Sequence, residues 1–242
     1  MSGPPIRWQE ADARLRAALE DTLPEAIEHA PPLHAGRHRR VFRLRLPGPS
    51  ATDVVVKHYR PASGARRLRE ALKRVAGRDP ARREWRALAR LQTAGLPVPR
   101  PLAWGEGRRG EAFVVTERLR GRPLAEELAE TNQAPLLRRR LVALCDTLKA
   151  LHDAGLAHGD LHLGNLWWGP EGVWLLDVGH IRPIHHPKDH DRDRAQLEFS
   201  LARSLPHARA VEMLRSLWGA SSDLDAARID FLRDYQRGRA RR

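Results

Sequence analysis

The stretch from residue 158 to residue 179, HGDLHLGNLWWGPEGVWLLDVG, constrains the fold of this chain more than any other. It holds short apolar segments at 166–168 and 173–176, separated by Gly-Pro-Glu-Gly. Apolar segments joined by such a turn sequence predict a β-hairpin. Because a hairpin returns the chain to its starting point, we expect Asn165, before the first strand, and Asp177, after the second, to lie at the same open end.

The polar side chains at this end predict phosphoryl-transfer chemistry. Asn165 and Asp177 offer amide and carboxylate oxygens, which suit Mg²⁺ bound to nucleotide phosphates. Asp160 precedes them on the loop that follows a predicted helix, where its carboxylate could orient an attacking hydroxyl and accept the proton. A single Asp or Asn in a loop is usually a turn former. The spacing H-x-D-x-x-x-x-N followed by D-x-G after a hairpin is far more specific.

This constellation resembles the protein-kinase-like superfamily. His158, Asp160 and Asn165 match its catalytic loop, and Asp-Val-Gly at 177–179 matches its D-F-G element. The resemblance implies an α+β, two-lobed fold with a small antiparallel-sheet N-terminal lobe and a mainly helical C-terminal lobe. We place these lobes at residues 1–118 and 119–242.

Within the superfamily, the chain is most similar to the lipopolysaccharide core kinases, which phosphorylate Kdo or heptose sugars. The similarity runs from about residue 36 to 185 and is carried by VVVKHYRPASGARRLREALKR, REWRALARLQTAGLPVPRPLA, VVTERLRGRPL and HGDLHLGNLWW. HGDLHxGN is shared with aminoglycoside phosphotransferases and choline kinases, so a small-molecule phosphotransferase is an alternative. A pseudokinase scaffold is disfavoured because Lys57, Asp160, Asn165 and Asp177 are all present.

The resemblance implies ATP and Mg²⁺ as cofactors and assigns roles to individual residues. Lys57 would hold the α- and β-phosphates and be oriented by Glu84, Asn165 and Asp177 would hold the metal, and Asp160 would be the base. His162 takes the place of a lysine that contacts the transferred phosphoryl group in protein-serine kinases. The backbone from Glu117 to Leu119 would bind adenine, between apolar walls formed by Val41, Val55 and Trp167.

Departures from the kinase pattern narrow the expectation further. In place of G-x-G-x-x-G, the segment HAGRHRRVFRL has only Gly36, so Arg37, His38 or Arg39 would have to supply charge where amide donors are missing. Gly159 replaces the arginine that reads a phosphorylated activation loop, and the 65 residues after Asp177 contain no A-P-E. A loop-switched protein kinase is therefore disfavoured, whereas an atypical protein kinase stays open.

The charge of the chain predicts a polyanionic partner. Lys and Arg number 43 against 30 Asp and Glu, a formal net charge of +13. A basic amphipathic helix at 65–75 could lie on an anionic membrane, although an arginine-rich composition alone could explain the charge. A basic nucleic-acid-binding protein is a further alternative, disfavoured because the sequence contains no recognition motif. The N-terminus has no apolar signal segment and no apolar run reaches spanning length, so we expect a cytoplasmic enzyme, peripheral on the inner face of the cytoplasmic membrane.

The remaining segments predict the order of elements. We expect helices at 8–22, from Asp79 to Gly95 and at 136–155, and adjacent antiparallel strands in RRVFRLRLPG and ATDVVVKHYRP. Cys145 lies on the apolar face of the 136–155 helix, which favours a buried packing role. A zinc site is a weaker alternative, built from His158, Asp160, His162, His185, His186 and His190.

Overall fold

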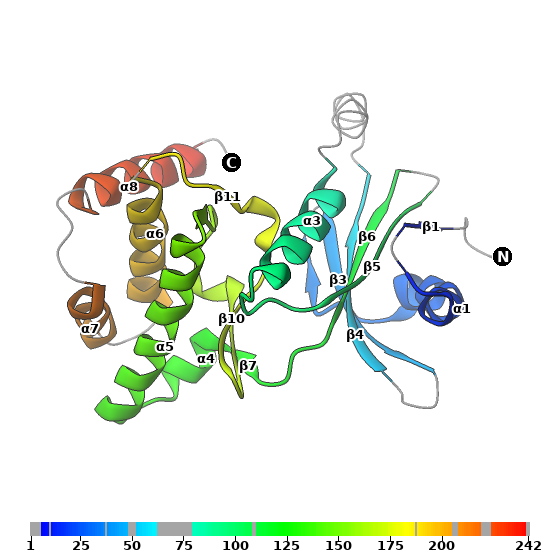
Figure 1. Ribbon diagram of the computed structural model, residues 1–242, viewed down its shortest axis with the longest axis horizontal. Coiled ribbons are helices and arrows are strands. Elements are labelled where there is room, and N and C mark those ends of the chain that lie inside the picture. Colours follow the sequence, from blue (N-terminus) through cyan, green and yellow to red (C-terminus); the bar gives the residue numbers. More distant parts are fainter. Residues whose placement is uncertain are drawn as a thin grey trace. The chain divides into compact units, whose positions relative to one another are not determined.

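A computed structural model describes residues 6–9, 11–36, 38–47, 52–61, 79–107, 110–186, 188–204, 208–218 and 224–240. The chain divides into two units, one of Met1–Gln92 with Pro99–Leu119 and the other of Thr93–Val98 with Arg120–Arg242 (Figure 1). The predicted basic helix at 65–75 lies outside the described residues. No helix within the described ranges combines the length and apolar character needed to cross a membrane.

The first unit is built on an antiparallel sheet of six strands, in the order β1-β5-β6-β4-β3-β2. Their bounds are β1 Arg7–Trp8, β2 His34–Ala35, β3 Arg39–Leu46, β4 Thr52–Tyr59, β5 Pro101–Glu106 and β6 Ala112–Glu117. β3 and β4 pair antiparallel over their whole length, from Arg39 opposite Tyr59 to Leu46 opposite Thr52. This confirms the predicted strand pair, which follows from β-branched runs separated by turn residues.

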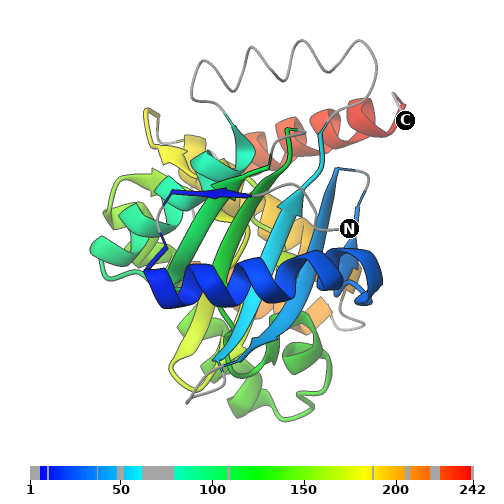
Figure 2. The ribbon, with the colours of Figure 1, turned by 90° about the vertical axis from the view of Figure 1, so that its right-hand side faces the viewer.

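Helix α1 (Ala13–His29) lies across one face of this sheet (Figure 2). It buries Leu19 and Leu23 against a core that includes Phe42, Val54 and Val56. The predicted helix at 8–22 is therefore wrong at both ends. The Asp12 carboxylate caps the helix by accepting from the Leu15 N–H at 2.8 Å, and the buried face extends past Pro24, because packing on the sheet outweighs the backbone hydrogen bond that a proline removes.

His58 on β4 is buried in this unit beside the core. Its ring stacks on Phe113 with centroids 4.6 Å apart, and its Nε2 lies 3.4 Å from Glu111 Oε1. Burial lowers the pKa of His58, an effect that Glu111 partly opposes. His58 is therefore neutral when folded, whereas the unfolded chain takes up the proton below about pH 6.5.

We expect the free energy of unfolding to fall as the pH drops from about 7 to 5, by at most about 1.4 kcal/mol per pH unit for each such histidine. His58→Phe keeps an aromatic ring without a titrating group, so its stability should fall less steeply over this range. Denaturant unfolding at several pH values measures both slopes. His158 and His190, whose pKa values are also lowered by burial, are unchanged in both proteins. Parallel curves for the variant and the parent would show that His58 does not titrate as argued.

The second unit is mainly helical. Its helices are α4 Leu124–Ala129, α5 Ala134–Asp153, α6 Lys188–Ser204, α7 Ala208–Trp218 and α8 Leu224–Ala240. α5 buries a stripe of leucines, namely Leu137, Leu141, Leu144, Leu148 and Leu151, as its periodicity predicts. Cys145 is half-buried on this helix, less buried than the predicted core role implies. Burial raises the pKa of the thiol to about 11, which keeps it protonated and inert.

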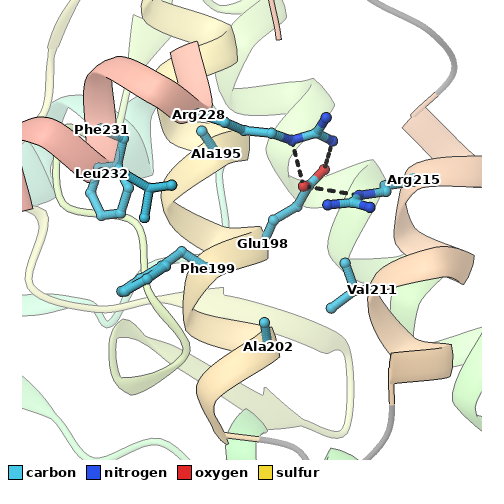
Figure 3. A pocket seen from close by; sticks show the side chains of 9 residues that line it. All are labelled: Ala195, Glu198, Phe199, Ala202, Val211, Arg215, Arg228, Phe231 and Leu232. Atoms are coloured by element: carbon cyan, nitrogen blue, oxygen red, sulfur yellow. Dashed lines mark hydrogen bonds and ion pairs between the residues drawn. The ribbon is translucent and has the colours of Figure 1, made fainter. Parts of the chain in front are cut away.

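A pocket of about 180 Å³ lies among α6, α7 and α8 (Figure 3). Its charged groups bind one another, because the buried carboxylate of Glu198 accepts hydrogen bonds from Arg228 at 2.8 Å and from Arg215 at 3.1 Å. Phe199 packs edge-on against Phe231 beside them, with centroids 5.4 Å apart. We interpret this pocket as a helix-packing junction because its guanidinium groups already have a carboxylate partner.

Candidate active site

The predicted lysine and glutamate form an ion pair within the first unit. Lys57 lies on β4 and Glu84 on helix α3 (Pro80–Thr93). The Lys57 Nζ binds Glu84 Oε1, and the Glu84 side chain is 2% exposed. The other carboxylate oxygen accepts from the Tyr59 hydroxyl. Asp79 caps α3 by accepting from the Ala81 N–H at 2.8 Å, which confirms the predicted helix start.

The sheet places the predicted apolar wall residues beside Lys57. Val41 lies directly opposite Lys57 in the β3–β4 register, and Val55 lies two residues before Lys57 on the same strand. Side chains at alternate positions of a strand share one face, so Val41, Val55 and Lys57 lie on the same face of the sheet, opposite to the α1 core. Both valines are half-buried, which leaves part of their apolar surface exposed.

The predicted hairpin is present in the second unit. β9 (Leu166–Gly169) pairs antiparallel with β10 (Gly172–Leu175), from Gly169 opposite Gly172 to Leu166 opposite Leu175. Just beyond the last pair, the Leu176 N–H donates to the Asn165 carbonyl at 2.8 Å. This bond brings Asn165 and Asp177 to the same end of the hairpin, as predicted. Asp177 has φ 53° and is the one non-glycine residue with positive φ among the described residues.

Asp160 and Asn165 are tied together through the loop. The Asn165 side-chain amide donates from Nδ2 to the Asp160 carbonyl at 2.9 Å. This bond fixes the amide orientation and directs its oxygen, the acceptor atom, away from that carbonyl. Asn165 is buried, whereas the Asp160 side chain is 39% exposed. The carboxylate of Asp160 is therefore accessible, and its supporting amide is held in place.

One face of α6 holds the loop through side-chain hydrogen bonds that the sequence motifs did not indicate. The buried Asp193 accepts from the His158 N–H at 2.7 Å through one oxygen and from the Gly159 N–H at 2.9 Å through the other. Gln196 donates from Nε2 to Asp160 Oδ1 at 3.0 Å, and its carbonyl accepts from the Leu161 N–H at 3.1 Å.

Ser200, one helical turn further along α6, accepts from the Leu163 N–H at 3.0 Å. The spacing 193, 196, 200 puts these three side chains on one face of the helix. This periodicity of polar residues in an otherwise ordinary charged helix is the signal that could have identified them. The sequence motifs also did not indicate Tyr59, because its hydrogen bond to Glu84 depends on how α3 lies beside β4.

His158 and Gly159 explain the shape of the loop. The His158 ring is fully buried, with Nε2 3.2 Å from the Leu176 carbonyl. Burial lowers the pKa of His158, so the ring is neutral and structural. Gly159 has φ +76°, and a Cβ there would lie 2.7 Å from the His180 carbonyl oxygen. No larger residue fits without moving the backbone, which accounts for the absence of the arginine found in regulated kinases.

His162 caps the short helix η1 (Leu163–Asn165), its Nδ1 accepting from the Gly164 N–H at 3.1 Å. Its Nε2 lies 3.9 Å from Asp160 Oδ2, so His162 borders the accessible carboxylate. Throughout the part of the chain that is described, no three His, Cys, Asp or Glu side chains cluster as metal ligands. The zinc alternative therefore has no support from the structure.

The other predicted nucleotide-binding residues differ in whether their backbone N–H groups already have an acceptor within the protein. The Gly36 N–H donates to the Arg39 carbonyl at 2.8 Å, so this amide cannot also donate to a phosphate. The Glu117 N–H is bonded to the Arg100 carbonyl at 3.0 Å. Leu119, in contrast, has no protein acceptor for its N–H among the described residues. Trp167 lies in the second unit, its Nε1 donating to the Arg120 carbonyl at 3.1 Å.

The residues at the hairpin end fit a hard divalent cation. Asn165 has its amide oxygen turned away from Asp160 by the Nδ2 bond, and Asp177 adds a carboxylate at the adjacent strand end. Two oxygen donors of this kind match the usual coordination of Mg²⁺, which keeps waters and phosphate oxygens as its other ligands. The set contains no soft ligand that would favour a different metal.

An antiparallel sheet unit with an internal Lys–Glu pair, and a helical unit with this loop and hairpin, define a protein-kinase-like fold. A solved structure agrees with a TM-score of 0.53 and 17% sequence identity, covering 86% of this chain and 77% of that chain. That protein is described as a divergent kinase that lacks the glycine-rich loop and regulates membrane ultrastructure of the Toxoplasma parasitophorous vacuole.

The chain belongs to the lipopolysaccharide kinase (Kdo/WaaP) family, whose profile matches residues 36–217. It is 36% identical over 132 residues to 3-deoxy-D-manno-octulosonic acid kinase of Stenotrophomonas maltophilia R551-3, covering 51% of each chain. It is also 32% identical over 169 residues to the RIO-type serine/threonine-protein kinase Rio1 of Haloferax volcanii, covering 64% of this chain and 56% of that protein. The chain thus spans about half the length of the curated relatives it matches.

Proposed function

We propose that the protein transfers the γ-phosphoryl group of ATP to a hydroxyl of a lipopolysaccharide inner-core sugar, Kdo or heptose. The observation that carries this proposal is the geometry of the catalytic loop. Gln196 donates a hydrogen bond to the accessible Asp160 carboxylate, and the Asn165 side chain donates one to the Asp160 backbone carbonyl. The family match and the likeness to Kdo kinases support a sugar hydroxyl as the acceptor. Such an acceptor is borne by lipid, so the enzyme would work against an anionic membrane surface.

In this proposal, Asp160 accepts the proton of the attacking hydroxyl, and its second oxygen stays fixed on Gln196. Lys57 binds the α- and β-phosphates while Glu84 orients its ammonium group. Asn165 and Asp177 would hold Mg²⁺, which neutralises the charge of the phosphates. The N–H of Leu119, which has no acceptor among the described residues, would bind adenine. Since the Gly36 amide is already bonded, phosphate binding would rest on side-chain charge.

A protein acceptor is a second candidate function, because the chain is similar to a RIO-type protein kinase over 64% of its length. Purified protein should be incubated with labelled ATP and Mg²⁺, and separately with a Kdo-bearing acceptor, a heptose-bearing acceptor, an aminoglycoside, casein and RNA. Label in a core sugar would support the proposal and identify the sugar. Label in casein alone would favour a protein kinase over a sugar kinase. Stably bound zinc without ATP turnover would contradict both functions.

Gln196→Leu should reduce kcat about 10- to 100-fold, because the Asp160 carboxylate then loses the donor that fixes its direction. KM for ATP should change little, since Gln196 touches the base and not a predicted nucleotide-binding residue. Steady-state kinetics with varied ATP gives both values. Gln133→Leu, at an exposed position of the same unit, is the matched control and should behave as the parent. An unchanged kcat in Gln196→Leu would remove this residue from the reaction.

A further inference from the structure

Helix α3 has two chemically opposite faces. One face carries Ala81, Glu84, Leu88 and Leu91, all buried. Arg83, Arg86 and Arg90 are exposed. Their spacing of three and four residues places them in one row along the helix, spanning about 10 Å at 1.5 Å per residue. We call this row the α3 arginine stripe.

Within the described part of the chain, no acidic side chain neutralises the charge of the α3 arginine stripe. Glu84 is the only acidic residue of α3, and its carboxylate is bound by Lys57 and Tyr59 on the opposite face. No carboxylate lies within ion-pair distance of the stripe among the described residues.

Helix α8 is also rich in arginine, but its arginines form ion pairs with aspartates of the same helix. Each of its arginines with a described side chain has an aspartate three residues earlier, in the pairs Arg228–Asp225, Arg233–Asp230 and Arg237–Asp234. Composition alone therefore does not explain the stripe, because the chain pairs the arginines of one helix and leaves those of another available to an external anion.

We propose that the α3 arginine stripe docks the protein on a membrane surface of anionic lipid headgroups. The apolar residues Leu88 and Leu91 of α3 are buried, so binding would be electrostatic, through guanidinium groups and lipid phosphates, without insertion of the helix. A straight row of guanidinium groups on a rigid helix suits a plane of phosphates. The exposed face of α3 has no aromatic residue among its arginines to stack a base, and charge without a reading element is weak support for nucleic acid.

This inference rests on the proposed function for its biological sense, because the acceptor is lipid-borne, but its test needs no turnover. Binding of the whole protein to vesicles is measured by sedimentation without ATP. One set of vesicles contains phosphatidylcholine and phosphatidylglycerol, and the other contains phosphatidylcholine alone. A vesicle result and a phosphoryl-transfer result can therefore fail separately.

The decisive comparison is between two triple variants of equal charge. Arg83→Gln/Arg86→Gln/Arg90→Gln removes the stripe, and Arg16→Gln/Arg138→Gln/Arg139→Gln removes three exposed arginines of α1 and α5. Because each basic residue near an anionic surface contributes about a fivefold affinity gain, the stripe variant should lose about 100-fold in binding to anionic vesicles. The control variant should stay within a few fold of the parent.

Parental binding should also weaken as salt rises, and circular dichroism should show both variants folded. Equal losses in the two variants would overturn the proposal, since bulk charge would then suffice. Binding to a single-stranded RNA that depends on the stripe, without binding to anionic vesicles, would also overturn it and assign the stripe to nucleic acid.

Discussion

Asp160→Asn is expected to lower phosphoryl transfer by about 10³-fold, the range typical of a lost general base. The asparagine has nearly the same shape, and its carbonyl oxygen can still accept from Gln196 Nε2, which now lies 3.0 Å from Asp160 Oδ1. The amide cannot accept the proton of the attacking hydroxyl. The loss should therefore fall on kcat, with KM for ATP nearly unchanged, and single-turnover transfer of labelled phosphate measures it.

Asp153→Asn is the matched control for this substitution. Asp153 is an exposed carboxylate of the same unit that pairs with Lys149, so its loss should leave kcat as in the parent. Thermal unfolding should show that both variants are as stable as the parent. If Asp160→Asn keeps more than about a tenth of the parental rate, Asp160 is not the base, and the proposed roles of the loop fail together.

Asp193→Ala should destabilise the protein by about 3 kcal/mol, because removal of a buried carboxylate leaves its donors unsatisfied. Asp193 Oδ2 accepts from the His158 N–H and Oδ1 from the Gly159 N–H. His152 Nε2 lies 3.2 Å from the same carboxylate. Denaturant unfolding monitored by circular dichroism measures the loss, and phosphoryl transfer should decline with it because the loop backbone is released.

Asp193→Asn refines this prediction. Its side chain has one acceptor oxygen, so it can satisfy only one of the two backbone N–H groups and must present an NH₂ group to the other. Its cost should therefore approach that of the alanine variant. Asp234→Asn, which weakens the exposed pairings with Arg192 and Arg237, should cost less than about 0.5 kcal/mol. A stable Asp193→Asn protein would show that the loop does not depend on this carboxylate.

The sequence predicts best where a local pattern has a single structural solution. Two apolar segments around Gly-Pro-Glu-Gly could hardly form anything but a hairpin, and this alone places Asn165 and Asp177 together. The start of α3 follows from Asp79 and Pro80 for a similar reason, since capping is decided within one helical turn. The predicted bounds of 8–22 for α1 were wrong because the helix starts after its cap at Asp12 and its packing on the sheet keeps it continuous past Pro24 to His29.

The catalytic roles remain predictions, but the support for them now has two origins. The sequence alone provides the resemblance to lipopolysaccharide core kinases and the order of the candidate residues, Lys57, Glu84, Asp160, Asn165 and Asp177. Three features depend on the tertiary structure. They are the face of α6 that holds the loop, the contact of Tyr59 with Glu84, and the exposure of the α3 arginine stripe without a carboxylate partner among the described residues. Each depends on which residues distant in sequence become neighbours, and hydrogen bonding and ion pairing act over a few ångströms of space, whatever the separation along the chain.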